Sequence, residues 1–179
     1  METIEASGIV GMIALAGLAA NFVVGLCIWL NINKPLPFNL SFLQLHKITG
    51  YTATAGVLIH ILLLPLDPLS KFTWADILLP IWTEHQPIAN TLGAAALYLI
   101  GIVVISSYYK TKISLNTWRA LHFLSYFASV PLILHSIIMD PKLQDRPIDW
   151  FDAEKLFVIL CCGVICTLTI YRFFFVKKA

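Results

Sequence analysis

Four of the five histidines in this 179-residue chain lie in two strongly apolar segments, where they form two similarly spaced pairs. His46 and His60 are 14 residues apart, and His122 and His135 are 13 residues apart. In a helix these intervals correspond to rises of about 21 Å and about 20 Å. Ionisable side chains at membrane depth are energetically costly, so their presence indicates a functional role.

Two segments that each carry two histidines could offer one imidazole each to a shared metal, and this arrangement favours haem ligation. A neutral imidazole from each of two facing helices fills both axial positions of a haem iron, which suits electron transfer because no position stays open for a substrate. Zinc usually needs three or four clustered ligands, often with cysteine or carboxylate, and neither accompanies these pairs. The chain has no C-x-x-C-H motif, which predicts non-covalent attachment. We therefore expect these histidines to bind the iron of two haem b groups. A proton relay or metal pathway in a small transporter is the non-redox alternative.

The elements that must position these histidines are membrane helices. Hydrophobic residues make up 59% of the chain, charged residues make up 12%, and the mean hydropathy is +0.82, which excludes an ordinary soluble protein. A bilayer core requires roughly 20 apolar helical residues. Five segments meet this length, at about 8–30, 45–66, 88–109, 118–139 and 151–176. We expect one all-α integral membrane domain over residues 1–179, folded as a five-helix bundle around two stacked haems and surrounded by lipid, with no nucleic-acid partner.

The charges predict how the bundle is oriented. If five helices alternate, one side of the membrane receives 8 of the 12 basic residues and none of the 10 acidic ones. These eight are Lys34, Lys47, Lys110, Lys112, Arg119, Arg172, Lys177 and Lys178. Because short loops rich in Lys and Arg stay in the cytoplasm, the N-terminus should be outside and the C-terminus inside. This corresponds to a multi-pass protein of a prokaryotic cell (inner) membrane.

Segments 45–66 and 118–139 then run in the same direction, because one helix lies between them. His46 should pair with His122 near the inner face, and His60 should pair with His135 near the outer face. On an ideal helix the first two histidines are within about 40° of one face, whereas the other two are about 140° out of phase. Pro131 lies between the second two, and a kink or local unwinding there would supply the missing rotation.

Four further residues are candidates for contact with the cofactor. Gly50 and Gly56 lie four residues from the histidines of the same segment, so bare backbone there would let a porphyrin approach closely. Arg119 is one helical turn before His122 and could meet a haem propionate, as could Lys47. Anchoring at the inner membrane face is the alternative role for both cations.

Two stretches resemble a known family. Leu45–His60 reads L-H-K-I-T-G-Y-T-A-T-A-G-V-L-I-H, and Trp118–His135 reads W-R-A-L-H-F-L-S-Y-F-A-S-V-P-L-I-L-H. The doubled histidine spacing and the W-R-x-L-H motif are similar to the ferric reductase-like transmembrane domain of NADPH oxidases, ferric reductases and bacterial haem subunits of the YedZ/MsrQ type. The resemblance implies a bis-histidine di-haem core that carries electrons across the membrane, with His46, His60, His122 and His135 as its ligands.

The chain also departs from that family. Its oxidases and reductases carry a flavin and nicotinamide-binding domain after the last helix, but this chain has no G-x-G-x-x-G motif and one helix fewer than the usual six. We therefore expect an electron-transfer subunit of a hetero-oligomeric complex, without catalytic residues, served by separate donor and acceptor proteins or by a quinone. The alternative is a stand-alone quinol-dependent reductase of ferric iron or oxygen. His85, in the 65–87 loop, is either a solvated histidine or a guide for an acceptor, and the loop itself is a candidate docking surface.

Overall fold

The computed structural model describes residues 3–32, 40–67, 72–80, 83, 86–140 and 147–175. Its long helices are α1 (Thr3–Trp29), α2 (Phe42–Leu63), α4 (Pro87–Tyr108), α5 (Leu115–Ile138) and α6 (Ala153–Ile170). The short elements are η2 (Leu64–Leu66), α3 (Trp74–Leu78), η4 (Lys110–Lys112) and the π-turn η5 (Tyr171–Phe175). The described part contains no strand, and five helices are long and apolar enough to span a membrane. The prediction of an all-α membrane protein with five spanning helices is confirmed.

Local sequence explains where several helices begin. Ser41 and Gln44 form a capping box at the start of α2, in which each side chain accepts a hydrogen bond from the backbone N–H of the other residue. Ser114 and Asp152 cap α5 and α6 in a similar way. At the start of α4, Pro87 needs no hydrogen-bond partner for its nitrogen. The helix starts therefore follow from capping residues in the sequence.

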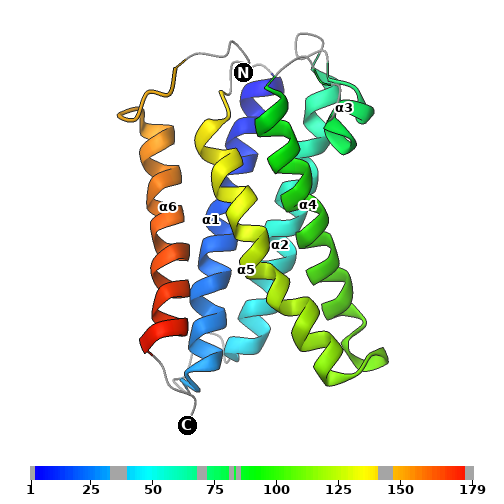
Figure 1. Ribbon diagram of the computed structural model, residues 1–179, viewed down its shortest axis with the longest axis vertical. Coiled ribbons are helices and arrows are strands. Elements are labelled where there is room, and N and C mark those ends of the chain that lie inside the picture. Colours follow the sequence, from blue (N-terminus) through cyan, green and yellow to red (C-terminus); the bar gives the residue numbers. More distant parts are fainter. Residues whose placement is uncertain are drawn as a thin grey trace.

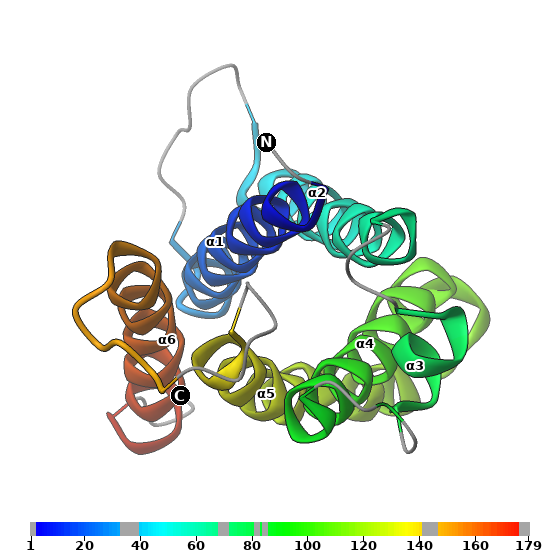
Figure 2. The same cartoon turned by 90° about the horizontal axis from the view of Figure 1, so that it is seen from above.

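The helices are arranged as two hairpins with an added helix. α1 packs along α2, and α4 packs along α5, whereas the two hairpins make few direct contacts with each other. Viewed from above, these four helices surround a common axis, and α6 lies outside them against α1 and α5 (Figure 2). α1 begins and α6 ends at opposite ends of the bundle (Figure 1). α6 therefore bridges the two hairpins on the outside, while few backbone contacts join them directly across the axis.

The distribution of apolar side chains is that of a protein surrounded by lipid. A compact cluster of buried residues joins α6 to α1, and it consists of Leu15, Ala19, Val158, Cys161, Cys162 and Ile165. In contrast, Ile13, Ile105 and Leu160 keep 64%, 61% and 67% of their surface exposed. Such exposure of large apolar residues is expected where the surrounding solvent is hydrocarbon. Cys161 and Cys162 act here as small packing residues.

Polar contacts tie the helix ends together at the end of the bundle where α1 begins. The backbone N–H of Ile4 donates to Asp67 Oδ2 over 2.7 Å, which joins the start of α1 to the end of α2. The buried carboxamide of Gln86 bonds both the N–H (2.9 Å) and the carbonyl (3.1 Å) of Asp140, which joins α4 to α5. Lys155 Nζ donates to three carbonyls at the end of α5, including that of Met139 at 2.6 Å. Hydrogen bonds between residues far apart in the sequence thus join the two helices of each hairpin at this end.

We predict that Gln86→Leu lowers the free energy of unfolding by about 1–3 kcal/mol, because it leaves the buried N–H and carbonyl of Asp140 without these partners. Thermal unfolding in detergent micelles measures the loss. Gln44→Leu is the control, since Gln44 is exposed and its bonds stay within the α2 cap. Equal losses in both variants would contradict the role given to Gln86.

Candidate metal centres

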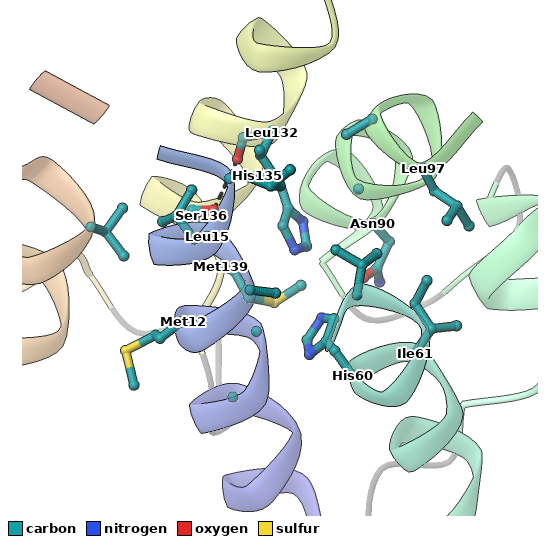
Figure 3. A pocket seen from close by; sticks show the side chains of 18 of the residues that line it. Met12, Leu15, His60, Ile61, Asn90, Leu97, Leu132, His135, Ser136 and Met139 are labelled. Atoms are coloured by element: carbon teal, nitrogen blue, oxygen red, sulfur yellow. Dashed lines mark hydrogen bonds between the residues drawn. The ribbon is translucent and has the colours of Figure 1, made fainter. Parts of the chain in front are cut away.

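The structure brings the four histidines together as two opposed pairs. The ring centres of His46 and His122 are 6.1 Å apart, with their planes inclined by 68°. The ring centres of His60 and His135 are 6.5 Å apart, with an inclination of 71°. The second pair appears in Figure 3, where the two rings point into the same space from α2 and α5. These are the pairs predicted from the parallel course of the two helices.

Hydrogen bonds at Nδ1 orient the rings of the His60–His135 pair. His60 Nδ1 lies 2.8 Å from the carbonyl oxygen of Ser7 and 2.9 Å from its hydroxyl. His135 Nδ1 lies 2.8 Å from the carbonyl oxygen of Ala89. A carbonyl oxygen only accepts, so both Nδ1 atoms carry the proton, and each Nε2 has a free lone pair. This tautomer is the one required of a histidine that binds a metal through Nε2.

The His46–His122 pair has weaker partners at the same positions. His122 Nδ1 lies 3.1 Å from the Ser107 hydroxyl. His46 lies beside the backbone of Asn21, and its buried Nδ1 has no hydrogen bond of ordinary geometry among the described residues. Trp118 stacks on His122 with ring centres 5.2 Å apart. The two pairs are therefore alike in ring separation and different in hydrogen bonding.

The separation within each pair fits a metal ion between the rings. Two imidazoles bound through Nε2 to one metal, with bonds of about 2.0–2.1 Å, have ring centres about 6.3 Å apart. The observed values of 6.1 and 6.5 Å lie on either side of this distance. Among the described residues, no group of three or more His, Cys, Asp or Glu side chains converges as a metal-binding cluster. A metal at either pair would therefore take most of its ligands from a non-protein group.

The His60–His135 pair opens into an apolar cavity. All five long helices contribute to its wall, which includes Met12, Leu15, Leu97, Met139 and Lys155. Most of the labelled side chains around the pair in Figure 3 are aliphatic or methionine. The cavity has a volume of about 160 Å³ between the side chains that line it. A large apolar ring system held by the two histidines fits this environment.

Small residues on α1 and α4 make room for the imidazoles. A Cβ atom at Gly11 would lie 3.0 Å from His60 Nδ1, and one at Gly25 would lie 3.4 Å from His46 Cε1. A Cβ atom at Gly93 would lie 3.0 Å from His135, and Ser107 follows 14 residues later beside His122. Sequence reasoning missed these four residues. The 14-residue interval that they share with the histidines of α2 is the pattern that could have revealed them.

The other predicted contacts have different surroundings. A Cβ atom at Gly50 would meet Asn21 at 2.8 Å, and one at Gly56 would meet Ala14 at 3.1 Å, so the close approach at these glycines is to α1. This helix packing accounts for both glycines, and their contact with a porphyrin stays a prediction. Arg119 and Lys47 are exposed, and their role toward a propionate also stays a prediction.

The next expectation concerns Pro131, which lies between the two histidines of α5. α5 is one continuous helix from Leu115 to Ile138, so its two histidines reach their partners without a break at Pro131. A bend at this proline stays a prediction.

His85 lies outside the described residues, as does part of the 65–87 loop. Within that loop, α3 is held to α4 by a hydrogen bond from the Tyr98 hydroxyl to the carbonyl of Leu78.

We predict that Gly93→Ala destabilises the fold by about 1–3 kcal/mol, because the added methyl group overpacks His135. Gly101→Ala is the matched control on the same helix, since a Cβ atom there meets no atom within 4 Å. The control should be neutral or slightly stabilising, because alanine favours a helix. Thermal unfolding of the two variants checks this, and equal destabilisation would remove the steric explanation.

Comparison with known proteins gives one match. The family described as ferric reductase like transmembrane component matches residues 10–133, which is more than half of the chain. The match includes His46, His60 and His122 and ends just before His135. No curated protein and no solved structure matches the chain significantly.

Proposed function

Because the chain belongs to the ferric reductase-like transmembrane component family, we propose that it transfers electrons across a membrane through two non-covalently bound b-type haems. His46 and His122 would hold one haem, and His60 and His135 would hold the other. The observation that carries this proposal is the opposition of two imidazoles at 6.1 and 6.5 Å. Each pair would supply the two protein ligands of one haem iron.

The surroundings of the histidines support electron transfer over substrate chemistry. When bound, a haem with two histidine ligands exchanges single electrons through its edge, because no coordination position is open to a substrate. Hydrogen bonds at Nδ1 hold the rings of His60 and His135 in one orientation. Most of the side chains that line the cavity beside this pair are apolar. These residues bind, orient and shield the site, and no residue of the chain is assigned a catalytic step.

The proposed partners follow from the proposed redox role, because electron transfer through the two sites needs a donor and an acceptor. We propose that it acts as a subunit of a larger membrane complex, with electrons delivered and removed by separate proteins or by a quinone. The described cations Lys47, Lys110, Lys112, Arg119 and Arg172 lie near the turns at one end of the bundle. The positive-inside rule would direct this end to the cytoplasm of a prokaryotic cell.

We predict that the purified protein gives a reduced-minus-oxidised spectrum of haem b with two haems per chain. His122→Ala and His135→Ala should each retain one haem, because each substitution removes a ligand from a different pair. Pyridine haemochrome analysis measures the ratio of haem to protein. His85→Ala is the control and should retain two haems. Absence of a b-type signal from the wild-type protein would refute the proposed function.

The pairing gives a second prediction. His46→Ala and His122→Ala should lose the same haem, and His60→Ala and His135→Ala should lose the other, as judged by low-temperature spectra of the haem that remains. Loss of one haem by His46→Ala and of the opposite haem by His122→Ala would contradict the paired ligation.

The orientation is also testable. A fluorescent protein that folds only in the cytoplasm should be fluorescent when fused to the C-terminus and dark when fused to the N-terminus, because the basic end of the bundle should face inward. The reverse pattern would invert the proposed orientation and leave the haem proposal intact.

A further inference from the structure

The two histidine pairs differ in the hydrogen bonds and charges around them. We propose that these residues make the His46–His122 pair the more easily reduced of the two haem sites, so that a single electron shared by the protein rests there. This inference depends on the proposed function. The electron moves between the two sites without forming or breaking a bond in the protein and without transferring a proton.

The first difference is in the hydrogen bonds at Nδ1. Both histidines of the His60–His135 pair donate to backbone carbonyls over 2.8 Å. Donation from Nδ1 to a good acceptor makes the imidazole a stronger electron donor through Nε2, which stabilises the oxidised iron and lowers its reduction potential. In the other pair, His122 has a serine hydroxyl at 3.1 Å, and His46 has no ordinary hydrogen bond among the described residues. Weaker donation there favours the reduced state.

The second difference is a fixed positive charge beside the His46–His122 pair. The Arg172 guanidinium lies 5.1 Å from the centre of the Tyr126 ring and 5.3 Å from that of Trp29, and it donates to the Tyr126 hydroxyl. Both Arg172 and Lys110 interact electrostatically with His122. An arginine stays protonated in proteins. Reduction adds a negative charge to a site, so a nearby cation stabilises the reduced form.

The other pair also has a nearby cation, but acidic groups and carbonyl dipoles oppose its charge. Lys155 interacts electrostatically with His135. Its ammonium donates to three backbone carbonyls at the end of α5, where the helix dipole is negative. It also interacts with Asp140, Asp152 and Glu154. The charges around the His60–His135 pair therefore partly cancel. They favour reduction less than Arg172 and Lys110 do at the His46–His122 pair.

A potentiometric titration of the haem-loaded protein tests the order of the two sites. At half reduction we expect at least a tenfold preference of the electron for the His46–His122 site, which is a gap of about 59 mV for one electron. The two midpoints are assigned with His135→Ala, which keeps the His46–His122 site, and His122→Ala, which keeps the other. Equal midpoints, or the reverse order, would overturn the inference.

Variants that keep all four histidines provide an assignment independent of ligand loss. Arg172→Gln should lower the midpoint of the His46–His122 site, and Ser107→Ala should raise it. Ser7→Ala should shift the other midpoint less, because the Ser7 carbonyl still accepts from His60. Lys112→Gln, an exposed cation at the same end of the bundle, is the control for a general charge effect. A shift from Lys112→Gln as large as that from Arg172→Gln would refute the local role of Arg172.

These outcomes are separate from those of the proposed function. A protein that binds no haem in any preparation refutes the proposed function. A protein that binds two haems with equal or reversed midpoints refutes only the inference about their order.

Discussion

The arrangement of the bundle depends on the opposition of imidazole rings across its axis. In His60 and in His135, Nδ1 donates a hydrogen bond to a carbonyl oxygen, so the lone pair of each ring is on Nε2. The two rings point into the same space between α2 and α5 (Figure 3). Two such lone pairs repel unless an electrophile lies between them. The two hairpins have few other contacts with each other. Under the proposed function, metal binding and closure of the bundle would therefore be thermodynamically linked, as they are in proteins whose metal site forms only on folding.

The two hairpins share one arrangement. One helix of each hairpin carries two histidines, and the neighbouring helix places a small residue beside each histidine and provides hydrogen-bond partners for them. On α1 these are Gly11 and Gly25, with Ser7 one turn before the first. On α4 they are Gly93 and Ser107, with Ala89 one turn before the first. The residue that admits an imidazole and the residue that orients it are thus neighbours on one helix face.

The sequence predicts most of the fold because the spanning helices depend mainly on the length of their apolar segments. Apolar length identifies the five spanning helices, and the single helix between α2 and α5 makes these two parallel, which gives the pairing of the histidines. The sequence is less informative about which face of each helix packs against which neighbouring helix. The sequence therefore does not show that Gly50 and Gly56 adjoin α1, or that Gly93 lies beside His135. Arg172 was counted only as a cation of the inner side, because its approach to Tyr126 depends on how the end of α6 meets α5.

The placement of α6 has a consequence for how the protein is made. α6 carries no histidine, and it lies outside the other four spanning helices, against α1 and α5. Its two ends bring Lys155 to the end of α5 and Arg172 to Tyr126. It also follows the other four spanning helices in the chain, so it leaves the ribosome after them. During synthesis the two histidine-bearing helices and their neighbours therefore enter the membrane before α6, and the arrival of α6 completes the electrostatic surroundings of both histidine pairs.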